Sequence, residues 1–228
     1  MDIDFKRQAA SAASTLVNNQ SVIGLGAGAS IAYMIDFLSE RMQKGLHVTI
    51  LTSSSDTKKI LLEKNIPVVD TSGVSSIDMY FDGCDQFDKE LNALKSGGGI
   101  HTQEKLLASM AKEFILVGDD SKYVNQLDTK FPLVIEFIPE ARGFVEKEIK
   151  EVLDVARIVL RMDKLSGKEL ITKNKNYLFD VWVNIWPELS IINPTLKNIT
   201  GVLETSLFYK MADKAVIAGA QGIRVIKN

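Results

Sequence analysis

Cysteine is almost absent from this 228-residue sequence: Cys84 stands alone, so no intrachain disulfide can form. Chains without disulfides are typical of reducing compartments. Basic residues are not in excess either, and the net charge of −2 argues against a nucleic-acid binder, which needs a basic face. The sequence also lacks an apolar run of membrane-spanning length and, at residues 1–6, the segments of a signal peptide. We therefore expect a cytoplasmic protein that binds neither nucleic acid nor membrane.

Metal-binding patterns are missing as well. Histidine occurs twice, at His47 and His101, which are too far apart for the spacing of a zinc site. A run of carboxylates lies within residues 82–90, but it lacks the alternating ligands, central glycine and distant glutamate of a calcium loop. We expect no metal.

Predicted strands and helices alternate in the first half of the chain. Val48–Thr52, for example, is an apolar, β-branched run of the kind that is buried in parallel sheets. This alternation predicts an α/β fold with a doubly wound, mainly parallel sheet. The other expected strands are 21–24, 66–69, 77–81 and 114–117, and the expected helices are 5–17, a segment ending near 41, 56–64 and a segment ending near 110.

The pattern changes at Lys130. Strands are expected at 133–137, 157–162 and 177–183, and helices at 144–155 and 194–199. This order indicates a ferredoxin-like α+β insert, after which the chain returns to close the first domain. We expect an α/β catalytic domain of residues 1–129 plus 201–228 and a ferredoxin-like insert domain of residues 130–200.

Three loops that follow predicted strands carry small polar residues, and they span 24–30, 52–56 and 82–86. Ligands of open α/β sheets bind beyond the carboxyl ends of the strands, so we expect these loops at one edge of the sheet. The first loop leads into a helix N-terminus, where free amides and the helix dipole favour phosphate. A dinucleotide site would tolerate Ala29 at its third glycine position, but no acidic residue ends the strand near Thr52. We therefore disfavour NAD binding.

Groups that can do chemistry are concentrated between Asp82 and Glu104. Asp82 and Asp85 lie three positions apart, and Lys95 comes shortly before glycines 97–99, whose amides a small polar ligand can approach closely. The lysine and the two aspartates can stabilise charge or move protons on neighbouring oxygens.

Glu104 is expected in the first turn of a helix that has Thr102 as its N-cap. A carboxylate in this position can act as a general base for a carbon acid. In proteins without activity a first-turn glutamate only complements the helix dipole, so the pattern by itself leaves both interpretations open.

Three motifs in this stretch resemble type A ribose-5-phosphate isomerase: Asp-Gly-x-Asp from Asp82, Lys-x-Gly-Gly-Gly from Lys95, and Thr-x-Glu-Lys from Thr102. Family-like segments follow the same order along nearly the whole chain, at 24–28, 52–56, 131–139, 193–194 and 201–208. The resemblance implies a cofactor-free isomerase of the non-oxidative pentose phosphate pathway that interconverts ribose 5-phosphate and ribulose 5-phosphate. It also implies a homodimer or a tetramer.

The resemblance assigns roles to individual residues. Glu104 is the base, Lys95 and the amides of glycines 97–99 stabilise charge on O1 and O2, and Asp82 and Asp85 handle hydroxyl protons, including those of ring opening. The residues expected to bind the sugar and phosphate are Gly26, Ala27, Gly28, Ala29, Ser30, Ser54, Ser55, Gly97, Gly98, Lys6 and Lys122.

The glycine loop departs from the family pattern, Gly-x-Gly-Thr-Gly-Ser-Thr. This chain has Ala27 for the first threonine, Ala29 for the serine and Ser30 for the last threonine. Two hydroxyls are therefore missing, and each lost hydrogen bond to a charged group costs ~1.5–3 kcal/mol of binding. We expect either a raised KM or a shifted substrate. A further change, Gln86 where the family usually has Glu, lies outside the expected catalytic residues.

Two other functions fit parts of the pattern. Coenzyme A transferases of related fold use a glutamate as nucleophile, but their chains are longer and the set of Asp82, Asp85 and Lys95 would be unexplained. A non-catalytic sugar-phosphate sensor would fit the two alanines of the glycine loop. It would leave the retained catalytic set without a purpose, and no helix-turn-helix segment precedes Ser21.

Overall fold

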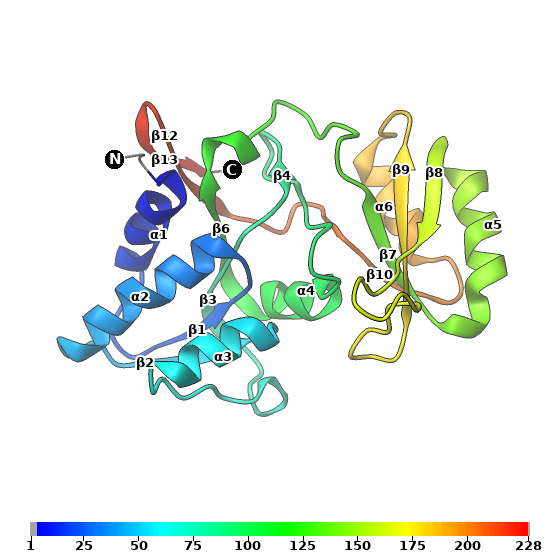
Figure 1. Ribbon diagram of the computed structural model, residues 1–228. Helices are drawn as coiled ribbons and strands as arrows, with labels where there is room; N and C mark the ends of the chain where they lie inside the picture. Colours follow the sequence, from blue (N-terminus) through cyan, green and yellow to red (C-terminus); the bar gives the residue numbers. More distant parts are fainter. Residues whose placement is uncertain (1–3, 228) are drawn as a thin grey trace. The chain divides into compact units, whose positions relative to one another are not determined.

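The computed structural model describes residues 4–227 (Figure 1). Its contacts divide the chain into two compact units. The first comprises the chain up to residue 84, residues 103–123 and the chain from residue 210, and the second comprises 85–102 and 124–209. The insert expected at 130–200 thus lies wholly within the second unit, which also includes other segments. Its assignment as a domain of its own stays a prediction.

The first unit is built on a six-stranded sheet in the order β13-β12-β6-β3-β1-β2. All neighbours pair in parallel except β12 and β13, so the predicted doubly wound, mainly parallel sheet is confirmed. The strands are β1 (Ser21–Leu25), β2 (Val48–Thr52), β3 (Ile77–Asp82), β6 (Ala111–Asp119), β12 (Lys214–Gly219) and β13 (Gly222–Lys227).

The prediction of a strand at 66–69 is wrong. This segment meets β2 only through an isolated bridge between Val68 and Ile50. Pro67 has no backbone N–H to donate to a ladder, which explains why pairing does not extend along the segment.

Helices α1 (Phe5–Thr15) and α2 (Ala29–Gln43) lie side by side on one face of this sheet (Figure 1). Asp4 caps α1, because its carboxylate accepts a hydrogen bond from the amide of Arg7 at 3.2 Å. Alternate strand residues such as Phe81 pack against these helices in a buried apolar core. Because side chains alternate along a strand, Tyr80 and Asp82 point to the opposite face. The remaining helical segments of this unit are α3 (Ser55–Glu63), η1 (Thr71–Gly73), η2 (Asp120–Lys122) and α4 (His101–Met110) from residue 103 onward.

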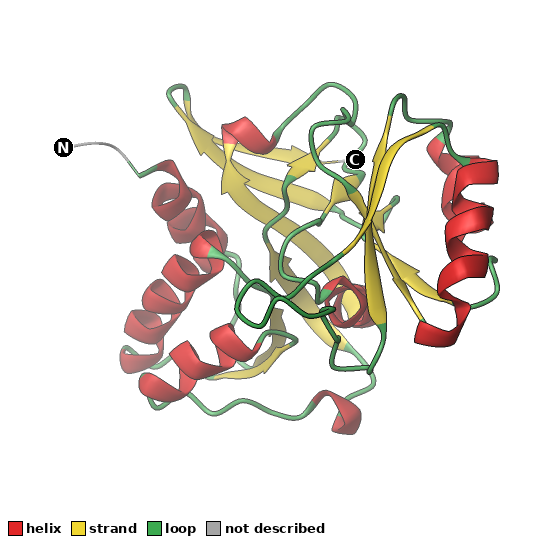
Figure 2. Cartoon of the chain, turned by 45° about the vertical axis from the view of Figure 1, so that its right-hand side comes forward, coloured by secondary structure: helices red, strands yellow, loops and turns green. Residues whose placement is uncertain are grey.

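The second unit contains an antiparallel sheet in the order β10-β7-β9-β8. Together with α5 (Arg142–Val152) and α6 (Leu189–Lys197), which lie side by side (Figure 2), the chain order is strand, helix, strand, strand, helix, strand. The first strand is central and the last lies beside it, which is the ferredoxin-like arrangement predicted from the sequence. The strands are β7 (Leu133–Phe137), β8 (Val155–Leu160), β9 (Tyr177–Val183) and β10 (Val202–Thr205), and η3 (Pro139–Ala141) precedes α5.

Helix α6 begins earlier than predicted. It starts at Leu189 and contains Pro194, where the sequence suggested that the helix would begin. Ile192 and Leu196, four positions apart, are both buried in the core of the unit, so packing extends the helix on the N-terminal side of the proline.

Within residues 4–227 no helix is long and apolar enough to cross a membrane.

A small three-stranded sheet, β11-β5-β4, completes the second unit. It consists of β4 (Gln86–Phe87), β5 (Ala93–Leu94) and β11 (Leu207–Phe208). The amide of Asp85 donates to the carbonyl of Leu94 at 2.9 Å, so this hairpin brings the chain on either side of it together. Asp85 and Lys95, ten positions apart in sequence, thereby become neighbours in the fold.

Candidate active site

The carboxyl ends of the strands in the first unit lie in register. Leu25 at the end of β1 is opposite both Thr52 in β2 and Phe81 in β3, and Asp82 is opposite Leu116 in β6. The loops after β1, β2 and β3 therefore begin at the same edge of the sheet, as predicted. Such an edge is the usual place for a ligand in an open α/β sheet.

Asp82, the last residue of β3, is completely buried, and both of its carboxylate oxygens accept hydrogen bonds. One oxygen accepts from the amides of Ala27 at 3.0 Å and Gly83 at 2.8 Å, and the other accepts from the Tyr80 hydroxyl at 2.6 Å. A methyl group added at Gly26 would lie 2.0 Å from the Asp82 carboxyl carbon. The glycine at this position therefore makes room for the aspartate.

Tyr80 lies two residues before Asp82 on the same face of β3 and is also completely buried. Burial raises the pKa of its hydroxyl well above the usual value, and the nearby negative charges of Asp82 and Glu104 raise it further. The hydroxyl therefore remains protonated and acts as a donor to Asp82. Sequence reasoning missed Tyr80, although a tyrosine two positions before a strand-terminal aspartate is a usable signal.

Glu104 lies in the first turn of α4 (His101–Met110), as predicted, and its side chain is buried. Its negative charge contributes to the raised pKa of Tyr80, so Glu104 lies within electrostatic range of the tyrosine that donates to Asp82.

The prediction that Thr102 is the N-cap of this helix is wrong. The helix begins one residue earlier, at His101, and the Thr102 hydroxyl donates to the carboxylate of Glu136. Glu136 lies in β7 and is completely buried. Its carboxylate also accepts hydrogen bonds from the hydroxyl of Thr172 and the side-chain amides of Asn174 and Asn176. A buried carboxylate needs donors, and this one takes the hydroxyl that a cap would have used.

Two backbone amides of the glycine loop after β1 are already bonded to β3. The amide of Gly26 donates to the carbonyl of Phe81 at 2.8 Å, and the amide of Ala27 donates to Asp82. Gly28 is the N-cap of α2 and has a φ of 94°, which only glycine adopts readily. The capacity to bind an anion therefore belongs to the first turn of α2, with the exposed Ala29 and the buried Ser30.

Helix α3, which follows β2, contacts the glycine loop through a hydrogen bond. Ser54 is its N-cap and accepts from the amide of Thr57 at 3.2 Å, as the sequence suggested for one of the three serines. The Thr57 hydroxyl in turn donates to the carbonyl of Gly26 at 2.6 Å. Ser55, the first residue of the helix, is exposed.

Lys6 and Lys122 both lie near the carboxyl end of β6. The Lys6 amino group lies 3.9 Å from the carboxylate of Asp119, the last residue of that strand. Asp119 also caps η2, the short helix that ends at Lys122. The structure therefore brings both lysines to the edge of the sheet where the glycine loop lies.

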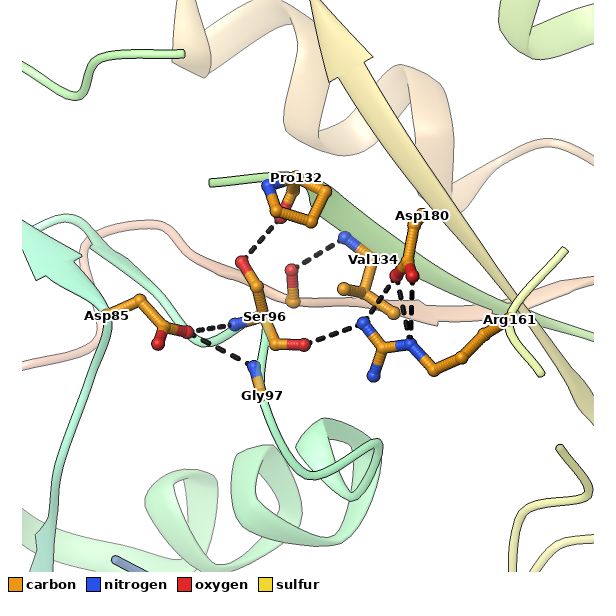
Figure 3. A network of polar contacts seen from close by, with 8 residues as sticks. Asp85, Ser96, Gly97, Pro132, Val134, Arg161 and Asp180 are labelled. Carbon is orange, nitrogen blue, oxygen red and sulfur yellow. Dashed lines mark hydrogen bonds and ion pairs between the residues drawn. The ribbon is translucent and has the colours of Figure 1, made fainter. Parts of the chain in front are cut away.

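The other predicted residues, Asp85, Lys95, Gly97 and Gly98, belong to the second unit. One oxygen of Asp85 accepts from the amides of Ser96 at 2.5 Å and Gly97 at 3.1 Å (Figure 3). Lys95 is buried, its amide donates to the carbonyl of Ser206 at 3.0 Å, and its amino group lies 5.7 Å from the centre of the Phe208 ring. Asp85 thus holds the loop that carries the lysine.

Comparison with known proteins places the chain in a family. The model of the family ribose 5-phosphate isomerase A (phosphoriboisomerase A) matches residues 49–222. This chain belongs to the ribose 5-phosphate isomerase A family. Ribose-5-phosphate isomerase A of Protochlamydia amoebophila is 36% identical to it, covering 98% of this chain and 95% of the relative. The Bacillus mycoides protein of the same name is 34% identical, covering 97% and 99%.

Solved structures of the ribose 5-phosphate isomerase A family agree with this fold. The enzyme from Methanocaldococcus jannaschii is 33% identical, covers 98% of both chains and superposes with a TM-score of 0.89. A D-ribose-5-phosphate isomerase solved in complex with phospho-erythronic acid is 29% identical and has a TM-score of 0.92, covering 99% of this chain and 100% of that one. Within the described part of the chain no group of three or more histidine, cysteine or acidic side chains could hold a metal ion.

Proposed function

We propose that this protein interconverts ribose 5-phosphate and ribulose 5-phosphate through an enediol. Similarity to ribose-5-phosphate isomerase A over 98% of the chain, with the three motifs around Asp82, Lys95 and Glu104 intact, is the observation that carries the proposal. The related isomerase that binds phospho-erythronic acid, a phosphorylated sugar acid, supports a substrate of the same class.

Glu104 is the base in this proposal. It removes the proton from C2 of the open-chain aldose, the electron pair moves to the C1 carbonyl, and the same group returns the proton to C1 of the enediol to give the ketose. Its burial suits this role, because bulk water that could exchange with the transferred proton is kept away from the carboxylate.

Lys95 and the amides of Gly97 and Gly98 stabilise the negative charge that develops on O1 and O2. Asp82 and Asp85 move protons between the hydroxyl groups and assist opening of the furanose ring. The Tyr80 hydroxyl donates a hydrogen bond to Asp82 at 2.6 Å and so fixes the orientation of this carboxylate.

The phosphate and sugar are bound by groups at the carboxyl edge of the parallel sheet. The first turn of α2 with Ser30 supplies amides and a hydroxyl, and Lys6 and Lys122 supply positive charge. Ser54 and Ser55 border the sugar, beside the loop of Gly26, Ala27, Gly28 and Ala29. The two alanines offer no hydroxyl to the substrate, so we expect a higher KM than in isomerases with threonine and serine there.

The sugar supplies its own carbonyl, so the proposed reaction needs no cofactor. We further propose that the enzyme works in the cytoplasm, in the non-oxidative pentose phosphate pathway, as a homodimer or a tetramer. These three statements rest on family membership and on the absence of a membrane-spanning helix among residues 4–227.

The deciding experiment measures formation of ribulose 5-phosphate from ribose 5-phosphate in the presence of a chelator. We expect turnover by the wild type and a loss of about 10²–10⁴-fold in kcat for Glu104→Gln, the range lost when a general base is removed. Glu63→Gln is the matched control, because Glu63 is an exposed glutamate at the end of α3. Absence of turnover in folded wild type would refute the proposal, and binding of ribose 5-phosphate without turnover would then indicate a sensor.

A further inference from the structure

Arg161, which follows β8, joins the loop of Lys95 to the ferredoxin-like sheet (Figure 3). Its guanidinium donates from Nε to both carboxylate oxygens of Asp180, at 3.0 and 3.1 Å, and from Nη2 to the carbonyl of Ser96 at 2.7 Å. Both side chains of the ion pair are more than four-fifths buried. This is a fixed, forked arrangement of donors that an arginine can make and a lysine cannot.

The peptide between Ser96 and Gly97 is held at both ends by charged groups. Arg161 binds its carbonyl oxygen, and Asp85 accepts a hydrogen bond from its N–H at 3.1 Å. A cation at the carbonyl and a carboxylate at the amide polarise the peptide in the same direction, so the two hydrogen bonds strengthen each other. The positive charge of Arg161 thereby acts on Asp85 through a single peptide group.

The backbone next to Lys95 is fixed by the same network. Asp85 also accepts from the amide of Ser96, and the Ser96 hydroxyl donates to the carbonyl of Pro132. Gly99 has a φ of 69°, and a methyl group added to it would lie 2.9 Å from a Leu178 side-chain carbon and at ordinary contact distance, 3.6 Å, from a guanidinium nitrogen of Arg161. Hydrogen bonds at Ser96 and Gly97 and close packing at Gly99 therefore fix the loop that follows Lys95.

We infer that Arg161, oriented by Asp180, is a positioning residue that fixes Lys95, the loop amides and Asp85 in their reactive geometry. This inference rests on the proposed isomerase function. Arg161 touches none of the reacting atoms in this scheme; it acts through the Ser96–Gly97 peptide. Its loss should therefore lower the rate of the chemical step more than the affinity for the sugar phosphate, which is held mainly by groups of the first unit.

The test compares Arg161→Ala and Arg161→Lys with the control Arg157→Ala. Arg157 is an exposed arginine in β8, the strand that Arg161 follows, and its guanidinium lies over the Trp182 ring. We expect both Arg161 variants to lose about 10–100-fold in kcat, as displacements of about 1 Å do, with KM changed less than about threefold. The control should behave as wild type, and added guanidinium ion should restore part of the activity of Arg161→Ala.

Hydrogen–deuterium exchange over residues 95–99 gives a second readout that does not need turnover. Faster exchange in the Arg161 variants but not in Arg157→Ala supports positioning, whether or not ribose 5-phosphate is the substrate. Unchanged exchange and unchanged kcat in a folded variant would overturn the inference. The inference would also be overturned if kcat fell, added guanidinium did not restore it, and hydrogen–deuterium exchange stayed at the wild-type rate. If Arg161→Ala does not fold, Arg161→Lys, which keeps the charge and the stem, decides by the same two measurements.

Discussion

Replacing Gly26 with alanine should disturb Asp82 directly. The added methyl group would lie 2.0 Å from both the carboxyl carbon and one oxygen of Asp82, and 2.4 Å from the other oxygen. Real methyl groups of this kind essentially never approach another heavy atom closer than 3.0 Å. Either the carboxylate or the glycine loop must therefore move by about 1 Å.

The magnitude follows from what holds Asp82. Its carboxylate accepts three hydrogen bonds, from Tyr80, Ala27 and Gly83, and a hydrogen bond to a charged group contributes about 1.5–3 kcal/mol. Losing one of them, together with the strain of overpacking, about 1–3 kcal/mol, should lower the free energy of unfolding by roughly 3 kcal/mol. A shift of about 1 Å at a catalytic group should also lower kcat by about 10²-fold.

Urea unfolding and isomerase turnover measure both effects. Gly73→Ala is the control, because nothing lies within 4 Å of its added methyl group and Gly73 does not need a positive φ. Asp82→Ala removes the clashing atoms, so the stability cost of Gly26→Ala should nearly vanish in that background. Additive costs in the double variant, or wild-type stability and kcat for Gly26→Ala alone, would refute the reasoning.

Three further predictions concern buried or missing polar groups. The pKa of Tyr80 is higher in the folded than in the unfolded state, so its contribution to the free energy of unfolding is complete below about pH 10. Above that pH the free energy of unfolding should fall by about 1.4 kcal/mol per pH unit. Urea unfolding of Tyr80→Phe should lack this part of the pH dependence. Glu136→Gln places an amide among the donors around Glu136 and should cost about 1–3 kcal/mol in thermal unfolding; an unchanged melting temperature would contradict this. Ala27→Thr restores a hydroxyl and should lower KM for ribose 5-phosphate by about 10–100-fold at unchanged kcat; an unchanged KM would mean that residue 27 does not contact the substrate.

The elements that could be predicted from the sequence are those in which local pattern and packing agree. The strands at 133–137 and 177–183 have the observed bounds because each is an apolar run buried in the sheet between turn residues. The segment at 66–69 looked alike but contains a proline, and it makes a single bridge. The two-residue strands β4 and β5 escaped notice because so short a pairing has no periodicity to detect.

The candidate site divides in a similar way. The motif residues could be identified because their order in the chain is itself the signal, and the roles assigned to them stay predictions. Tyr80 lies two residues before the first motif and could have been suspected from its position before Asp82. Glu136 could not, because the donors that bind it come from segments more than thirty residues away in sequence.

Arg161 illustrates why support for a site is harder to predict than the site. The arginine is 19 residues from its partner Asp180 and 65 residues from Ser96, and only the pairing of β8 with β9 and the approach of the Lys95 loop bring the three together. A charged side chain at the end of a strand predicts solvent exposure when only the local sequence is considered. Its burial against the Lys95 loop is therefore information that exists only in the fold, and it locates a group on which the chemistry depends outside every motif that the sequence displays.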